Sequence, residues 1–229
     1  MMAVCPEKAK PIPVVIWTDS YGSDWHYFPE CLQTETESRK EILKAAGEDL
    51  PFEIKKINAV PGRMLDNRSM EEIEINFHWI RKGEAQMNVI LLGGNDIQTH
   101  AYNGAARFLA NIRTLTKWHD GSNCPLMLCG IPPRPEVHYQ IEDLANYVDS
   151  KMKEYMTSRH AGNAKDCMFK FTKTYDFFRD ENGFCMTLNL YEKDEIHLNK
   201  AGAAKLCKRL CKEIEDQARD CMALGITKN

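Results

Sequence analysis

The stretch Ile12-Pro13-Val14-Val15-Ile16-Trp17-Thr18-Asp19-Ser20 joins a buried strand directly to a polar segment. Residues 12–17 are almost all apolar and several are β-branched, which is typical of a strand covered on both faces. Such strands belong to parallel sheets that helices flank on both sides. The polar residues that follow, from Thr18 to Gly22, then lie at the carboxyl end of the strand, where open parallel sheets place their functional loops.

The rest of the chain alternates strands with helices. Short apolar or alternating runs predict four further strands, at residues 52–57, 88–92, 125–129 and 167–171. Amphipathic stretches predict five helices, at residues 36–46, 69–81, 105–118, 141–156 and 199–223. Ser69 is the expected cap of the second helix, with Glu72 completing a capping box. This alternation predicts a parallel sheet with helices on both faces.

The composition is that of one globular domain. The chain has 229 residues, 43% hydrophobic and 28% charged, without an internal repeat or linker. We therefore expect a single domain over residues 1–229, with residues 1–11 as a flexible lead. The formal net charge of -3 argues against a protein that mainly binds a phosphate backbone, although a local basic patch would keep nucleic acid open as a partner.

The sequence also predicts a compartment. No apolar stretch approaches the roughly 20 residues that span a bilayer, and the first residues lack the pattern of a signal peptide. The nine cysteines are scattered, which favours reduced thiols and a cytoplasmic location. Cys207 and Cys211, four residues apart on a predicted helix, are interpreted as buried small hydrophobes rather than as metal ligands.

Three polar segments carry side chains that suit one reaction. Ser20 follows the first strand, and Asp194 and His197 precede the last helix. A serine hydroxyl becomes a good nucleophile when a histidine takes its proton, and a carboxylate on the other ring nitrogen orients that histidine. Because the functional loops of a parallel sheet gather at one edge, Ser20, His197 and Asp194 are predicted to form a catalytic triad.

The same edge supplies donors for the oxyanion that forms on attack. The backbone N–H of Ser20 and the side-chain amide of Asn95, in Gly93-Gly94-Asn95-Asp96, are two candidates. Gly62, in the loop Val60-Pro61-Gly62-Arg63, adds a backbone N–H with no side chain in the way. Simpler roles stay open for all of them, as turn residues, helix caps or a helix-entry loop.

These blocks, taken in order, resemble the SGNH hydrolase superfamily, also known as GDSL-type esterases and lipases. The resemblance rests on Asp19-Ser20, Gly62, the G-x-N-D block at residues 93–96, and Asp194-x-x-His197, which together span nearly the whole chain. It implies a flavodoxin-like, three-layer α/β/α sandwich with a five-stranded parallel sheet. It also implies ester hydrolysis without a metal or other cofactor. In that reaction Ser20 is the nucleophile, His197 the base and Asp194 its orienting acid, and Ser20, Gly62 and Asn95 form the oxyanion hole.

One position departs from the family. Thr18 stands where the family usually has glycine, directly before Asp19-Ser20. If that position needs a backbone shape reserved for glycine, a β-branched residue costs about 1–3 kcal/mol. It would also narrow the space beside the nucleophile, so we expect Thr18 to affect rate and substrate fit more than the fold.

Three further residues are candidates for substrate contact. Trp25 and Tyr27 follow the nucleophile closely and are placed to line an acyl or aromatic pocket. Arg134 lies in the proline-rich loop after the fourth strand, where it can meet an anionic head group. The remaining histidines have no matching partner pattern and are interpreted as structural or surface residues.

The sequence therefore predicts a serine esterase that acts on a small-molecule ester. A short, acetyl-like acyl group is favoured because the chain leaves little room for a lid domain. The alternative is an SGNH-like binding module with weak or no catalysis, either RNA-binding or encoded by a retroelement. Thr18 favours that alternative, whereas the complete set of Ser20, Asp194 and His197 favours catalysis.

Overall fold

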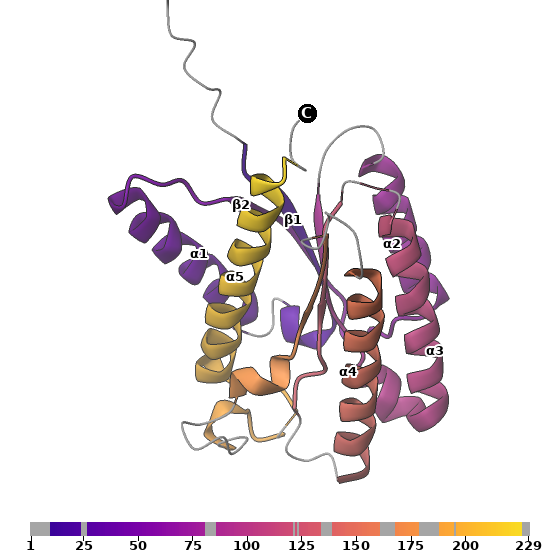
Figure 1. Ribbon diagram of the computed structural model, residues 1–229. Helices are drawn as coiled ribbons and strands as arrows, with labels where there is room; N and C mark the ends of the chain where they lie inside the picture. Colours follow the sequence, from indigo (N-terminus) through magenta and orange to yellow (C-terminus); the bar gives the residue numbers. More distant parts are fainter. Residues whose placement is uncertain are drawn as a thin grey trace, which may run out of the picture.

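A single parallel sheet organises the molecule (Figure 1). The computed structural model describes residues 10–23, 27–80, 86–120, 122, 124–133, 139–160, 168–178, 188–194 and 196–225. The strands are β1 (Ile12–Thr18), β2 (Phe52–Ala59), β3 (Met87–Leu91), β4 (Leu126–Cys129) and β5 (Phe169–Thr172). They pair in the order β2-β1-β3-β4-β5, and every pair is parallel.

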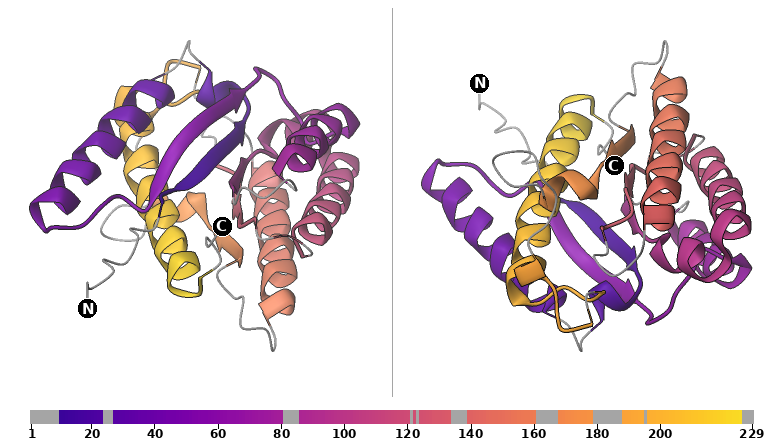
Figure 2. Two further views of the ribbon diagram at one scale, coloured as in Figure 1. Left: turned by 90° about the horizontal axis from the view of Figure 1, so that it is seen from above. Right: turned by 90° about the horizontal axis from the view of Figure 1, so that it is seen from below.

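Helices cover both faces of the sheet. They are α1 (Phe28–Ala45), α2 (Asn67–Ile80), α3 (Gly94–Asp120), α4 (Tyr139–His160) and α5 (Lys200–Ala223). Helices α1 and α5 lie on one side, and α2, α3 and α4 lie on the other (Figures 1 and 2). The predicted flavodoxin-like α/β/α sandwich with five parallel strands is confirmed.

The pleat of β1 builds two hydrophobic cores. Val14 and Ile16 point toward α1 and α5, whereas Val15 and Trp17 point toward the helices of the opposite layer. All four side chains are almost completely buried. The sequence of a strand with both faces buried is a continuous run of apolar residues, which is why this strand is easily predicted.

The strand order creates a switch point between β1 and β3. The connection from β1 runs through α1 to β2 on one side, and the chain then returns through α2 to β3 on the other side. Loops that leave β1 and β3 in opposite directions open a crevice at the carboxyl ends of these strands. Ser20 follows β1 and Asn95 follows β3, so the sequence places two candidate residues on the two sides of this crevice.

All five strands match the prediction within two residues at each end, whereas two of the five helix starts do not. Helix α1 begins at Phe28 rather than at residue 36, with Pro29 in its first turn. Proline lacks the N–H that a first turn leaves unused, so it is well accommodated there. Helix α3 begins at Gly94 rather than at residue 105, and it contains a kink at Ala101, where φ is 44°.

The predicted cap of α2 is wrong. The helix begins at Asn67, and the carboxylate of Asp66 accepts the backbone N–H of Ser69 at 3.0 Å, as an N-cap residue does. Ser69 lies inside the first turn, and its hydroxyl donates to the carbonyl of Met64 at 2.7 Å. Glu72 forms an ion pair with Arg63 instead of completing a capping box.

The edge strand β2 contains an irregularity. Val14 pairs with Ile54 but Val15 pairs with Lys56, so Lys55 is an extra residue in the register. Successive residues of a strand face opposite sides, and one inserted residue reverses that alternation. Ile54 and Ile57 therefore both pack against the core that faces α1 and α5.

No helix in the described ranges is long and apolar enough to cross a membrane. The expected flexible lead at residues 1–11 lies almost entirely outside the described residues, since only Lys10 and Pro11 of it are placed.

Candidate active site

Ser20 opens a single helical turn directly after β1. The turn, Ser20–Gly22, is capped by Asp19, whose Oδ1 accepts the backbone N–H of Tyr21 at 3.1 Å. An aspartate that bonds to the backbone two residues ahead forms an Asx turn, which reverses the chain sharply. Asp19 is 1% exposed, so the carboxylate that caps this turn is buried in the protein.

The three predicted triad residues form one continuous hydrogen-bonded chain. Nε2 of His197 lies 3.0 Å from Oγ of Ser20. Nδ1 of the same ring lies 2.6 Å from Oδ2 of Asp194. Residues 177 positions apart in the sequence therefore meet with the histidine between the hydroxyl and the carboxylate, which is the order that proton transfer requires.

Asp194 is held as a carboxylate. Burial would raise its pKa, but hydrogen bonds from the His197 ring and from the backbone N–H groups of His197 and Ile196 outweigh that effect and lower the pKa to about 2. Both backbone groups donate to Oδ1 at 2.9 Å, which leaves Oδ2 for the ring. The carboxylate therefore fixes the loop and orients the ring at the same time.

Backbone pairing closes the loop that carries Asp194 and His197. Tyr191 and Leu198 form an isolated antiparallel bridge, and the N–H of Glu192 donates to the carbonyl of His197 at 2.8 Å. Asn199 caps α5 with its side-chain oxygen and donates through Nδ2 to the carbonyl of Tyr191 at 3.1 Å. His197 is thus positioned by a loop whose two ends are joined by hydrogen bonds.

Tyr21 connects the Ser20–Gly22 turn to the same loop. Its hydroxyl donates to the carbonyl of Ile196 at 3.0 Å, and its ring meets the His197 ring edge-on with centroids 6.4 Å apart. Tyr21 is 4% exposed. Because it contacts residues on both sides of the Ser20–His197 hydrogen bond, it limits how far the two can separate.

Gly62 lies in a tight turn after β2. The N–H of Arg63 donates to the carbonyl of Val60 at 3.0 Å, and Gly62 has a φ of +71°. Proline in the second position and a positive-φ glycine in the third are the pattern of a type II turn. The turn's own hydrogen bond uses the N–H of Arg63, so the N–H of Gly62 is not part of it.

Asn95 ties the Ser20 segment to the Gly62 loop. Its Nδ2 donates to Oδ2 of Asp19 at 3.0 Å and to the carbonyl of Arg63 at 3.1 Å. The amide has two hydrogens, so each faces one protein acceptor. The N–H of Val60 also donates to the carbonyl of Thr18, at 3.3 Å, and these bonds bring the ends of β1, β2 and β3 together.

The carboxyl group of Asp96 is buried and bonds to the protein backbone rather than facing solvent. It is fully buried, and its Oδ2 accepts the backbone N–H of Leu65 at 3.0 Å. Burial raises its pKa to about 7, against the opposing effects of that hydrogen bond and of Arg107, whose guanidinium lies 3.8 Å from Oδ1. Asp96 therefore fixes the loop after β2 to the start of α3.

Thr18 adopts an ordinary backbone conformation. It is the last residue of β1, and the one non-glycine residue with positive φ in the described part of the chain is Ala101. The position therefore does not require glycine for its backbone, and the strain considered for it is absent. Its side chain is fully buried, and Oγ1 has no hydrogen-bond partner among the described residues.

Two of the three candidate substrate-contact residues, Trp25 and Arg134, lie outside the described residues. Tyr27 immediately precedes α1 and is 39% exposed. The sequence alone predicts no role for Asp19, Tyr21 or Arg63, although the structure places all three beside the candidate residues. The Asx-turn pattern at Asp19 was a readable signal, whereas the contacts of Tyr21 and Arg63 depend on distant parts of the chain.

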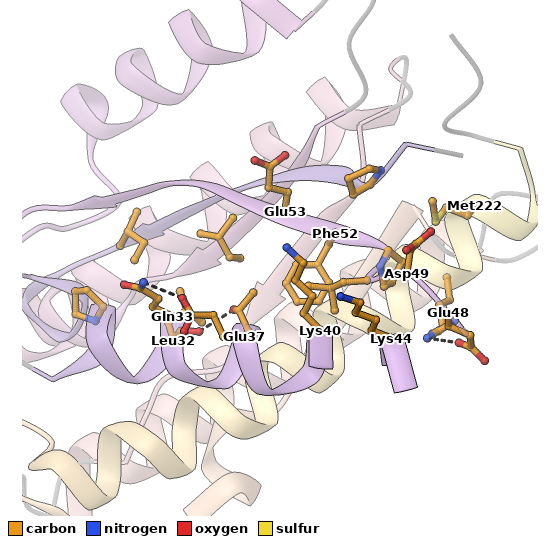
Figure 3. A pocket seen from close by; sticks show the side chains of 18 residues that line it. Leu32, Gln33, Glu37, Lys40, Lys44, Glu48, Asp49, Phe52, Glu53 and Met222 are labelled. Carbon is orange, nitrogen blue, oxygen red and sulfur yellow. Dashed lines mark hydrogen bonds and ion pairs between the residues drawn. The ribbon is translucent and has the colours of Figure 1, made fainter. Parts of the chain in front are cut away.

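A groove lies apart from the triad, between α1, β2 and the end of α5 (Figure 3). Its volume is about 1110 Å³, and neither Ser20, His197 nor Asp194 lines it. Apolar side chains of Leu32, Phe52 and Met222 line it together with charged ones such as Lys40 and Glu37. Within the described ranges, no group of three or more His, Cys, Asp or Glu side chains is arranged to hold a metal ion.

No protein-family model and no curated protein sequence matches this chain. Several solved structures, in contrast, have a similar fold. A family 3 carbohydrate esterase from Clostridium thermocellum is 16% identical with a TM-score of 0.63, over 92% of this chain and 98% of that one. A lipase/acylhydrolase from Enterococcus faecalis is 16% identical with a TM-score of 0.59, over 90% and 96%. A GDSL-like lipase from Bacteroides thetaiotaomicron is 17% identical with a TM-score of 0.52, over 90% and 88%.

Proposed function

We propose that this chain, which has the fold of the SGNH hydrolases, is a serine esterase. Its proposed substrates are small carboxylic esters with a short, acetyl-like acyl group. The observation that carries the proposal is the chain of hydrogen bonds from Ser20 Oγ through the His197 ring to Asp194, at 3.0 and 2.6 Å. A serine with a histidine on its hydroxyl and a carboxylate behind the histidine is suited to nucleophilic catalysis of acyl transfer.

The first half of the reaction forms an acyl-enzyme. His197 Nε2 takes the proton of the Ser20 hydroxyl while Oγ attacks the carbonyl carbon of the ester. The negative charge that develops on the carbonyl oxygen is stabilised by N–H donors, for which Ser20, Gly62 and Asn95 are the candidates. The tetrahedral intermediate collapses, the bond to the leaving oxygen breaks, and His197 gives its proton to the departing alcohol.

The second half releases the acid. His197 Nε2 takes a proton from a water molecule, whose oxygen attacks the acyl carbon on Ser20. The intermediate collapses and the bond to Oγ breaks. His197 then returns the proton to Ser20, and the carboxylic acid leaves. Asp194 stays ionised throughout and stabilises the imidazolium that forms in each half.

Asn95 can act as an oxyanion donor only by sharing or exchanging an acceptor. Both hydrogens of its amide face protein oxygens, on Asp19 and on Arg63. The bond to the neutral Arg63 carbonyl is weaker than one to a charged oxygen, so an oxyanion competes well for that hydrogen. Asp19 then keeps the amide in place while the second hydrogen is shared between the Arg63 carbonyl and the oxyanion.

The exposure of the triad supports a small acyl group. The side chains of His197 and Asp194 are 26% and 46% exposed, and Gly62 is exposed as well. As far as the described residues go, a site this open offers little apolar surface to a long acyl chain. Esters of acetate should therefore be cleaved faster than those of octanoate when kcat/KM is measured across a series of p-nitrophenyl esters.

The decisive experiment is labelling with a fluorophosphonate probe, which reacts only with an activated serine. We expect the purified protein to be labelled and Ser20→Ala to stay unlabelled while folding normally. Absence of labelling from the folded wild-type protein would contradict the proposal. The alternative binding module would then be examined through salt-dependent RNA binding.

A further inference from the structure

Arg63, directly after Gly62, is an unusual residue for a surface turn. Its side chain is 4% exposed, although arginine is seldom fully buried unless it is paired. Burial lowers the pKa of its guanidinium, and the carboxylate of Glu72 opposes that effect. The protein therefore stabilises a buried cation within one residue of a candidate oxyanion donor.

Three contacts from three elements hold the guanidinium. Nη1 donates to the carbonyl of Asn58 in β2 at 3.0 Å, and Nη2 is paired with Glu72 of α2. The guanidinium carbon also lies 5.7 Å from the centre of the Trp17 ring in β1, within the range of a cation–π contact. A planar group with several fixed donors can satisfy all three partners at once, which a lysine ammonium cannot do.

The backbone of the same residue faces the catalytic machinery. Its N–H closes the turn to Val60, and its carbonyl accepts from Asn95 at 3.1 Å. Arg63 thus connects the Gly62 turn and the Asn95 amide to β1, β2 and α2. Its side chain is too buried to reach a substrate, so any effect on the reaction passes through these neighbours.

We infer that Arg63 is a positioning residue, whose buried guanidinium fixes the Val60–Arg63 turn so that the Gly62 N–H and the Asn95 amide point at the same oxyanion. The inference rests on the proposed function, since it assigns a role within that site. Displacing reacting or stabilising groups by about 1 Å costs on the order of 100-fold in rate, so loss of the guanidinium should be visible in catalysis.

The test uses Arg63→Met, which keeps an unbranched apolar stem and removes the guanidinium, and Arg63→Lys, which keeps the charge. Arg68→Met is the matched control, because Arg68 lies 3.6 Å from the same Glu72 carboxylate but is 87% exposed. For each protein, kcat and KM are measured with p-nitrophenyl acetate and the rate of fluorophosphonate labelling is followed. Thermal unfolding is recorded to choose a temperature at which all variants are folded.

We expect kcat and the labelling rate to fall about 10- to 100-fold in Arg63→Met, with KM changed less than about threefold. Arg63→Lys should retain part of the rate, and Arg68→Met should equal the wild type. A stabilising role alone would lower the unfolding temperature and leave kcat of the folded fraction unchanged, so that result overturns the inference.

If Arg63→Met does not fold, Glu72→Gln replaces it, because the amide oxygen can still accept from Arg63 but without charge. Its kcat should fall by a smaller factor than expected for Arg63→Met, with KM again changed less than about threefold. A Glu72→Gln enzyme with wild-type kcat, together with unchanged kcat in Arg63→Lys, overturns the inference while the proposed function stands. Failure of the wild type to be labelled overturns both.

Discussion

Thr18 fills the space that a side chain at position 22 would need. A Cβ atom at Gly22 would lie 2.0 Å from Cγ2 of Thr18, well inside van der Waals contact. Thr18 precedes the Asp19-Ser20 pair, and Gly22 follows Ser20 by two residues. Side chains at positions 18 and 22 would therefore compete for the same volume beside the Ser20–Gly22 turn.

This relationship predicts a compensating pair of substitutions. Gly22→Ala should lower the free energy of unfolding by about 1–3 kcal/mol through overpacking, and it should slow fluorophosphonate labelling of Ser20. Thr18→Ser removes the methyl group that clashes, so Thr18→Ser/Gly22→Ala should recover most of the loss. Denaturant unfolding of the two single variants and the double variant gives the coupling energy. Additive effects would show that the residues do not share the volume.

The 2.6 Å contact between Asp194 and His197 predicts the effect of Asp194→Asn. The amide can keep its oxygen toward the backbone N–H groups, but it presents a donor to the ring nitrogen that should itself donate. By analogy with other triads, kcat should fall about 10³- to 10⁴-fold while the fold is kept. A variant that retains more than a tenth of the wild-type kcat would contradict a triad role for Asp194.

The depressed pKa of Asp194, about 2, determines how its contribution to the stability of the fold depends on pH. A carboxylate with a lowered folded-state pKa stabilises the protein above its unfolded pKa, and that contribution is lost as the pH falls through the folded value. Asp194 therefore stays ionised over the whole range of ordinary assays. The difference in unfolding free energy between the wild type and Asp194→Asn should therefore be nearly constant between about pH 5 and pH 9 and should shrink as the pH falls from about 4 to about 2, which urea unfolding at several pH values measures.

The two bonds of the Asn95 amide predict a loss of both rate and stability in Asn95→Ala. The variant removes the donor to Asp19 and to Arg63, so kcat should fall about 10²- to 10³-fold. Asn111→Ala is a matched control, because Asn111 lies on the same helix and its Nδ2 donates to the Leu65 carbonyl at 2.7 Å. That control should lose about 1–3 kcal/mol of stability and keep its kcat. Equal kcat losses in both variants would contradict a specific role for Asn95.

A buried carboxylate on α4 predicts a pH-dependent stability. Asp149 accepts the N–H of Ile131 at 3.1 Å, and burial raises its pKa to about 7, against the effects of that bond and of Lys173. Its proton is held more tightly in the folded than in the unfolded state, so stability falls as the pH rises from about 4 to about 7.

Asp149→Asn removes the share of this dependence that Asp149 contributes, while Asp96, whose pKa burial also raises to about 7, contributes equally in both proteins. The variant should gain on the order of 1–4 kcal/mol over the wild type on going from acidic to neutral pH. Urea unfolding at several pH values measures the difference. Identical slopes for the two proteins would mean that Asp149 does not titrate in this range.

The sequence predicted the sheet well and the helix starts less well. Strands with both faces buried, such as β1 and β3, appear as continuous apolar runs, and no other local structure competes for them. The sequence does not predict the start of α1 at Phe28, because no capping side chain marks it. The first turns of this helix are instead stabilised by packing against α5, which is distant in the sequence. Ser69 was misread as a cap since the pattern with Glu72 is local, whereas the pairing of Glu72 with Arg63 is not.

The residues of the candidate site were predictable, and their connections were not. Ser20, Asp194, His197 and Asn95 carry chemistry that is recognisable at the ends of their elements. The bonds from Tyr21 to Ile196 and from Asn95 to Arg63 join residues 175 and 32 positions apart. No local pattern encodes such contacts, because they depend on how the elements pack.

The extra residue in β2 has a consequence for the behaviour of the protein in concentrated solution. A sheet edge exposes unpaired backbone groups to which another strand can add, and proteins that leave an edge flat tend to aggregate. Here β2 is the terminal strand, and Lys55, at the irregularity, and Lys56 are exposed along it. A strand from a second molecule would have to match the shift in register and pack beside two exposed lysines, so this edge resists the pairing that starts fibrillar assembly.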